Sequence, residues 1–176
     1  GTQMVAKGLD FDKVHLVGIF DLDRMLHFPD FRATERTFQL CLQVSGRAGR
    51  REKKGLVVMQ TSDPEQDIVA RIVHNDYEGF FRNELHERSK FMYPPFTRLI
   101  KITLKDPERI KAEKAGIEMH RILFEYLGKD RILGPEAPMI DRIRNHYIRE
   151  IHLKLEKDIK NINELKTLLL KAKNLM

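Results

Sequence analysis

Residues 14–20 read Val-His-Leu-Val-Gly-Ile-Phe, an apolar run that ends at Asp21-Leu22-Asp23. Its length and its branched aliphatic residues predict a buried strand. A second strand is predicted at 56–61, Leu-Val-Val-Met-Gln-Thr, with an irregular loop at 24–32 and a helix from about Ala33 to Ala48 between the two. A strand, a helix and a strand in succession favour a parallel sheet, and therefore an α/β fold.

The helix predicted at 33–48 has an apolar face. Phe38, Cys41, Leu42 and Ser45 recur at helical spacing and are expected to point toward the core. Cys41 is the one cysteine of 176 residues, which excludes an internal disulfide and a cysteine-rich zinc site. It is interpreted as a small buried hydrophobe in a protein of a reducing compartment.

The end of that helix reads Gln-Val-Ser-Gly-Arg-Ala-Gly-Arg over residues 43–50. Steps of four and three residues place Gln43, Arg47 and Arg50 on one helix face. Gly46 and Gly49 keep this face free of bulk. Two guanidinium groups and an amide aimed one way suit the γ-phosphate of a triphosphate. The alternative is a solvated basic helix end with a glycine cap.

Residues 1–11, Gly-Thr-Gln-Met-Val-Ala-Lys-Gly-Leu-Asp-Phe, precede the first strand. Thr2 and the backbone N–H groups beside Gly1 and Gly8 are candidates to hold phosphates, and Asp10 to bind a water or an arginine. An ordinary turn is the alternative. Paired with residues 43–50, this segment resembles motifs V and VI of superfamily 2 helicases.

A closer resemblance covers the strings GTQMVAKGLDF and DLDRMLHFPDFRATERTFQLCLQVSGRAGR, followed by YPPF and ILGP. In this order they resemble the PriA family (primosomal protein N′), the helicases of bacterial replication restart. The resemblance is dense over residues 1–61, reduced to short landmarks as far as 135, and looser beyond.

The resemblance implies roles for residues in motifs V and VI. Arg50 would be the arginine finger, and Arg47 would contact the same phosphate or fix Gln43. The alternative for Arg47 is a structural salt bridge to an acidic neighbour such as Asp10. Gln43 would position the attacking water or sense the nucleotide. The glycines and the acidic residue expected at the nucleotide are Gly8, Asp10, Gly46 and Gly49. The residues expected at the phosphates of the tracking DNA strand are Thr2, Gln3 and Lys7. Coupling or DNA contact is expected at Asp21, Asp23 and residues 29–32.

The chain starts inside a motif, and we therefore expect a C-terminal fragment. By resemblance, the upstream part holds the phosphate loop, the acidic Mg²⁺ motif, the first helicase lobe and a zinc module. ATP and Mg²⁺ would be cofactors of the longer protein, and no metal ligand set is expected here. The histidines have no metal-binding spacing. The fragment alone is expected to be inactive as an ATPase.

Tyr-Pro-Pro-Phe at 93–96 divides the chain, because prolines and the residue before them disfavour helix. Before it, Asp63-Pro64 predicts a helix start, with helix to about Lys90 and a break near Asn75-Asp76. Residues 1–92 are assigned to the C-terminal part of a RecA-like helicase lobe. Residues 93–176 are assigned to a small α+β domain.

The pattern of the second domain is β-α-β-β-α. Residues 98–105 and 147–155 alternate as strands, and Arg131-Ile132-Leu133 is a short strand ended by Gly134-Pro135. Helices are predicted from Asp106-Pro107 and at the end of the chain. The first has Ala112, Ala115, Met119, Ile122, Leu123 and Tyr126 at core spacing.

The charge of the chain is uneven. Residues 1–92 hold 14 Lys/Arg and 14 Asp/Glu, so the net charge of +6 lies in residues 93–176. Arg142, Arg144, His146, Tyr147 and Arg149 predict a basic loop with an aromatic, which suits single-stranded DNA. A solvated hairpin is the alternative.

The function implied is that of an ATP-dependent 3′-to-5′ DNA helicase that recognises stalled forks and initiates primosome assembly. Its partners would be forked and single-stranded DNA, single-strand-binding protein and primosome proteins. No signal peptide or membrane-spanning run is present in the sequence, and the bacterial cytoplasm, at the nucleoid, is expected. The alternative function is a non-catalytic module that docks DNA or protein.

Overall fold

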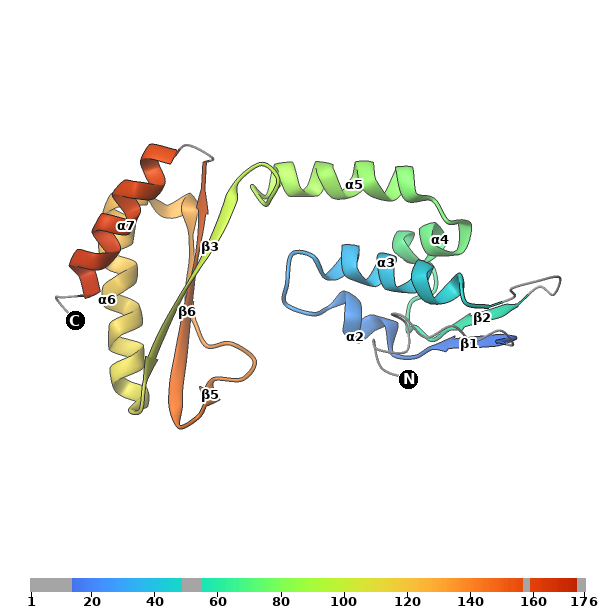
Figure 1. The fold of residues 1–176 in the computed structure, drawn as a ribbon, viewed down its shortest axis with the longest axis horizontal. Coiled ribbons are helices and arrows are strands. Elements are labelled where there is room, and N and C mark those ends of the chain that lie inside the picture. Colours follow the sequence, from blue (N-terminus) through green and yellow to red (C-terminus); the bar gives the residue numbers. More distant parts are fainter. Residues whose placement is uncertain (1–13, 49–54, 157–158, 174–176) are drawn as a thin grey trace. The chain divides into compact units, whose positions relative to one another are not determined.

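The computed structural model describes residues 14–48, 55–156 and 159–173. The chain divides into two compact units, Gly1–His86 and Glu87–Met176. Helix α5, Tyr77–Lys90, crosses this division, which lies slightly before the boundary expected at Tyr93 (Figure 1).

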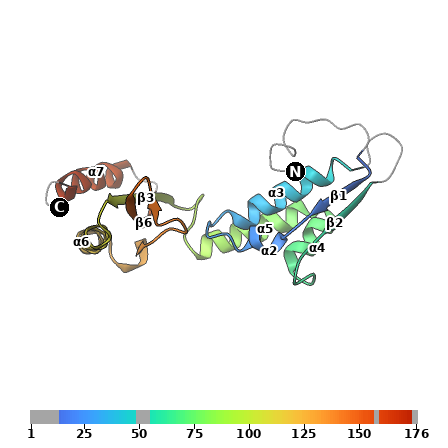
Figure 2. The same ribbon diagram turned by 90° about the horizontal axis from the view of Figure 1, so that it is seen from below.

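The first unit is built on two parallel strands, β1 (Leu16–Ile19) and β2 (Leu56–Met59), paired from Leu16↔Leu56 to Ile19↔Met59. The parallel pairing predicted from the strand–helix–strand order is confirmed. Helix α3 (Ala33–Ser45) runs alongside the strands in both views (Figures 1 and 2). The buried core consists of Ile19, Leu22, Phe38, Cys41, Val69, Ile72 and Phe80.

Cys41 is buried in this core, as expected. Burial raises the pKa of its thiol to about 11, because the thiolate loses its hydration in apolar surroundings. Beside it, the rings of Phe38 and Phe80 are stacked, with centroids 4.1 Å apart. The Cys41 side chain therefore contributes to the hydrophobic core and is not a reactive thiol.

The loop predicted at 24–32 begins instead with a short helix, α2 (Leu22–Leu26). Asp21, at φ 55°, is its N-cap and accepts a hydrogen bond from the Arg24 N–H at 3.4 Å. The Asp23 carboxylate accepts from Thr61 Oγ1 at 2.7 Å and from the Ser62 N–H at 2.8 Å. These hydrogen bonds, Thr61 first, lower the pKa of Asp23 and tie α2 to the segment after β2.

The helix start predicted at Asp63 is wrong. Asp63 accepts from the Glu65 N–H in a turn, and α4 (Asp67–His74) begins after Gln66. The predicted break is confirmed, because Asn75 adopts φ 54° after α4. Asp76 then accepts from the Gly79 N–H at 2.9 Å in the first turn of α5.

The second unit is a sheet of order β3-β6-β4 with helices α6 and α7, and the sheet pairs are antiparallel. A two-residue strand, β5, also pairs with β6. The predicted β-α-β-β-α order is confirmed, with β5 and a 3₁₀ turn, η1 (Lys129–Arg131), as additions. The element bounds are β3 Arg98–Asp106, α6 Arg109–Leu127, β4 Ile132–Glu136, β5 Arg142–Ile143, β6 His146–Leu155 and α7 Ile159–Lys173.

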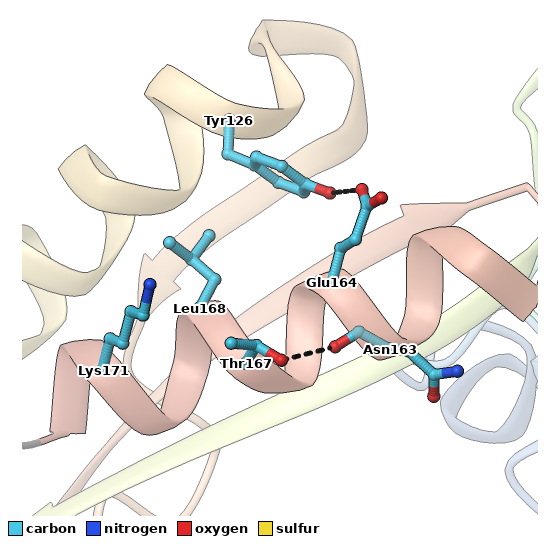
Figure 3. Close-up of a pocket in the computed structure, with 6 residues that line it drawn as sticks. All are labelled: Tyr126, Asn163, Glu164, Thr167, Leu168 and Lys171. Atoms are coloured by element: carbon cyan, nitrogen blue, oxygen red, sulfur yellow. Dashed lines mark hydrogen bonds between the residues drawn. The ribbon is translucent and has the colours of Figure 1, made fainter.

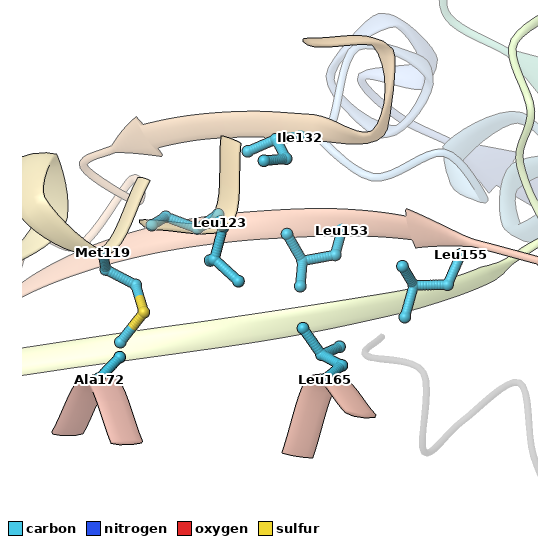
Figure 4. Close-up of a cluster of buried hydrophobic side chains, with 8 residues drawn as sticks. Met119, Leu123, Ile132, Leu153, Leu155, Leu165 and Ala172 are labelled. Carbon is cyan, nitrogen blue, oxygen red and sulfur yellow. The ribbon is translucent and has the colours of Figure 1, made fainter. Parts of the chain in front are cut away.

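The core of this unit lies between the sheet and its two helices. Side chains from α6, β4, β6 and α7 converge there (Figure 4), namely Met119, Leu123, Ile132, Ile151, Leu153, Leu155, Leu165 and Ala172. Ile100, Ile102 and Leu104 of β3 pack against them, as the alternation predicted. Tyr126, expected in the core, is 42% exposed and donates to Glu164 Oε2 at 2.6 Å.

Strand β4 contains a bulge that the sequence did not predict. Its register with β6 shifts between Leu133 and Glu136, so the strand continues through Gly134-Pro135. Gly134 has φ +93°, and a Cβ there would lie 2.6 Å from the Glu150 carbonyl oxygen. Glycine is therefore required for the close approach of β4 to β6.

Candidate functional site

The residues expected at a nucleotide phosphate lie at the end of α3. Gln43 is exposed and Arg47 is half-buried. The helix ends at Ser45, and the Gly46 N–H bonds the Leu42 carbonyl at 3.0 Å. The expectation of helix to Ala48 is therefore wrong, because glycine has a low helix propensity. Arg47 lies in the turn after the helix, where its N–H donates to the Val44 carbonyl at 3.0 Å.

Within the described part of the chain, a methyl group at Gly46 would meet only carbonyls of its own helix, at 3.6 and 3.7 Å. Among the described residues, this position has room for a methyl group, and the predicted approach of a second body there stays a prediction. The remaining candidates of this set lie outside the described residues: Thr2, Gln3, Lys7, Gly8, Asp10, Gly49 and Arg50. Their predicted roles stay predictions.

The basic residues of the second unit lie on a tight hairpin. Strands β5 and β6 pair Arg142↔Tyr147 and Ile143↔His146, which leaves Arg144 and Asn145 as a two-residue turn. Both turn residues have positive φ, 49° and 63°. Such turns match the twist of the paired strands and fix their register. The hairpin thereby holds Arg142 opposite Tyr147.

The side chains of the hairpin are partly organised. The Arg142 guanidinium lies over the Tyr147 ring, 5.1 Å from its centroid, and donates to Asn145 Oδ1 at 3.2 Å. The His146 ring nitrogen Nδ1 lies 2.9 Å from the Arg144 carbonyl oxygen. Arg142 and Arg144 are exposed, and Tyr147 is half-buried. A cation–π pair with an exposed guanidinium offers both charge and a flat surface.

Arg149 differs from the other predicted DNA contacts. It lies within β6, 6% exposed, on the same face as Ile151 and Leu153. Its guanidinium donates to Glu113 Oε1 at 2.5 Å and to the Ile148 carbonyl at 2.7 Å. The prediction that Arg149 belongs to the loop is corrected, because the two-residue period of the strand turns it inward.

Glu113 joins this buried arginine to a surface one. Arg109, the first residue of α6, donates to Glu113 Oε1 at 3.0 Å. Asp106, three residues before Arg109, pairs with Tyr147 of the hairpin. Arg109 thus lies at the same end of the unit as the hairpin. The sequence signal for it was the i,i+4 spacing of Arg109 and Glu113.

A shallow hollow lies elsewhere, between α6 and α7 (Figure 3). The Tyr126–Glu164 hydrogen bond joins α6 to α7 across this hollow. At its edge on α7, Thr167 Oγ1 donates to the Asn163 carbonyl at 3.0 Å. Its lining contains none of the residues predicted for a site. The lining residues are Tyr126, Asn163, Glu164, Thr167, Leu168 and Lys171.

Comparison with known proteins places these features in a family. A family model described as the primosomal protein N C-terminal domain matches residues 89–175. Replication restart protein PriA of Bacillus subtilis is 43% identical over 159 residues, covering 90% of this chain and 20% of that protein. The chain belongs to the PriA family.

Two other PriA proteins give similar values. PriA of Treponema pallidum is 43% identical over 156 residues, covering 88% of this chain and 24% of its own length. PriA of Synechocystis is 38% identical over 164 residues, covering 92% of this chain and 20% of that protein. The chain therefore spans about a fifth to a quarter of the length of these relatives. The α3 end lies outside the segment matched by the family model, and the β5–β6 hairpin lies within it.

The described part of this PriA-family chain holds no metal centre. Residues 14–48, 55–156 and 159–173 contain no group of three His, Cys, Asp or Glu side chains able to hold a metal ion. Over the same ranges, no helix has the length and apolar character needed to span a bilayer.

The Arg109–Glu113–Arg149 cluster predicts a pH dependence of stability. Hydrogen bonds from Arg109, then Arg149, lower the folded-state pKa of Glu113 below its ordinary value of 4.5. The stabilisation is thus present above pH 4.5 and is lost as pH falls through the lowered pKa. We expect Glu113→Gln to flatten the acid limb of a urea-unfolding series from about pH 6 to about pH 3. Glu125→Gln, which breaks only a surface pair with Arg121, is the control. Parallel pH profiles of wild type and Glu113→Gln would contradict the assignment.

Proposed function

We propose that this chain acts in the restart of DNA replication, as the C-terminal part of a PriA-type helicase. The support is its membership of the PriA family and the names of its relatives, which are replication restart proteins. The longer protein would be an ATP-dependent 3′-to-5′ DNA helicase that recognises stalled forks and initiates primosome assembly. ATP and Mg²⁺ would be its cofactors, with zinc in a separate module.

In this proposal the first unit is the C-terminal part of a RecA-like lobe. The parallel β1–β2 pair with α3 alongside supports it. The exposed amide of Gln43, with Arg47 and Arg50, would meet the γ-phosphate of ATP bound by the other lobe. Arginine donors stabilise charge in the transition state of phosphoryl transfer. The sequence contains no Walker-type phosphate loop, so we expect no ATP hydrolysis by this chain alone.

The second unit is proposed to dock forked or single-stranded DNA through the β5–β6 hairpin. The observation that carries this is the exposed Arg142 guanidinium held over Tyr147, two residues before Arg144 at the turn. Arginines at this spacing would bind successive phosphates, and the Arg142–Tyr147 pair offers a surface for an unstacked base. Arg149 would have a structural role.

A non-catalytic docking module for single-strand-binding protein or primosome proteins is the second candidate. It is favoured by the concentration of the net charge in residues 93–176. Electrostatic complementarity of this kind steers association with acidic partners of either class.

The test is fluorescence anisotropy of the chain with forked, single-stranded and duplex DNA over a salt series. We expect binding that weakens with salt, and a smaller salt slope for Arg142→Ala/Arg144→Ala. Loss of two phosphate contacts to a single strand should reduce that slope by about 1.4. Lys129→Ala/Lys166→Ala removes the same charge from exposed positions away from the hairpin. Equal losses in both double variants, or no binding at low salt, would contradict the hairpin proposal.

A further inference from the structure

The loop before the hairpin exposes apolar side chains. Residues 137–141 connect β4 to β5, and within them Met139 is 76% exposed and Ile140 is 66% exposed. Figure 1 shows this segment standing out from the sheet. The loop is anchored at its end, because the Ile148 N–H donates to the Asp141 carbonyl at 2.8 Å. Two large apolar side chains are thus exposed next to each other on a segment joined to β6 at Asp141, which marks a candidate interaction surface.

Two exposed arginines follow this pair in the sequence. Arg142 and Arg144 follow within four positions of Ile140. The loop also has a single aspartate, Asp141, which lies close enough to Arg109 of α6 to help raise the pKa of that guanidinium. Charge complementarity therefore favours an anionic partner that also presents an apolar surface. In DNA the phosphates are anionic and the base faces are apolar. Base faces are covered by stacking inside a duplex, and are open only where the duplex ends or branches.

We propose that Met139 and Ile140 pack against the open face of the last base pair at a duplex end or branch point. Arg142 and Arg144 would hold phosphates of the strand that leaves it. This inference rests on the proposed docking of DNA by the hairpin and names the feature of DNA that the site selects.

The dimensions are compatible with one contact surface. Arg144 lies four positions after Ile140, so their Cα atoms lie at most about 14 Å apart. Successive phosphates of one strand lie a few Å apart along the duplex axis, about 3.4 Å per step. The apolar pair and both arginines therefore reach a segment of about four nucleotides. Apolar side chains placed against base steps are an established means of contacting unstacked DNA.

The experiment compares Met139→Ala/Ile140→Ala with wild type in anisotropy titrations. The probes are a fork, a blunt duplex and the matching single strand, all of one sequence. We expect the preference for the fork over the single strand to fall about tenfold, since truncating two side chains removes apolar contact area. Single-strand affinity should change less than about twofold, because the phosphate contacts remain. The fluorescence of a 2-aminopurine placed at the junction should change when wild-type protein binds, whereas that of a 2-aminopurine placed well away from the junction should not.

Ile117→Ala/Leu170→Ala is the matched control, because it truncates apolar side chains of similar exposure, 64% and 65%, on α6 and α7. Circular dichroism of each variant verifies folding. If wild type binds no DNA, the proposed docking function fails together with this inference. If wild type binds DNA and Met139→Ala/Ile140→Ala keeps the fork preference, the docking function stands and this inference is overturned. An equal loss on all three probes also overturns it.

Discussion

Gly134→Ala is expected to lower the free energy of unfolding of the second unit by about 3 kcal/mol. Two effects add at this position. The φ of +93° disfavours any L side chain, and the new Cβ would lie 2.6 Å from the Glu150 carbonyl and 3.1 Å from the Glu136 nitrogen. Both neighbours are backbone atoms of the sheet, so neither can rotate away. Hydrogen exchange of the β6 amides, followed by mass spectrometry, measures the loss within this unit.

Gly128→Ala is the matched control for this prediction. Gly128 also has a positive φ, +77°, yet a Cβ added there would have no atom of the other described residues within 4 Å. The backbone cost alone is about 1 kcal/mol. The difference between the two variants therefore isolates the steric conflict between β4 and β6. Equal destabilisation by both would show that the bulge relaxes to accept a methyl group.

Leu153→Ala is expected to destabilise the second unit by about 2–5 kcal/mol. Leu153 is fully buried and pairs with Ile100 of β3 and Ile132 of β4. Truncation would leave a cavity between the sheet and helices α6 and α7, with little freedom to collapse. For a unit of this size, thermal unfolding should shift by about 4–8 °C per kcal/mol.

The control for Leu153 is Leu133→Ala in the neighbouring strand. Leu133 is 40% exposed and pairs with His152, the residue before Leu153. We expect an effect on the melting temperature several times smaller. If both variants melt alike, the core of the unit is not centred on β6.

Much of the second unit was predictable from alternation alone. Ile100, Ile102 and Leu104 mark one face of β3, and Ile151, Leu153 and Leu155 mark the same face of β6. The same two-residue period places Arg149 on the buried face. The burial of Arg149 was not predicted, because charged residues are rarely buried without a partner. Its partner, Glu113, is remote in the sequence, so the ion pair could not be foreseen.

The errors in the first unit concern local hydrogen bonds. Asp21 and Asp23 stabilise α2 through the Arg24 N–H, Thr61 and Ser62, and the last two contacts require the chain to return after β2. Asp63 carries the signal of a helix N-cap, yet accepts within a turn. Such short polar side chains cap turns and helices alike, so the local sequence does not distinguish the two.

The candidate site was predictable in part. The arginines and Tyr147 of the hairpin were identified from composition, whereas the cation–π pair depends on the Arg142↔Tyr147 register. Met139 and Ile140 were missed because apolar residues in a sequence are assigned to a core unless the fold exposes them.

The burial of Cys41 makes the chain convenient for site-directed labelling. With a pKa of about 11, this thiol is ionised in only about one molecule in a thousand at about pH 8, and it is enclosed by the core of the first unit. It is also the one cysteine of the sequence. A cysteine introduced at Asn145, in the exposed turn, should therefore react selectively with a maleimide dye without removal of the native thiol. Such a reporter would follow events at the hairpin while the remainder of the molecule stays unlabelled.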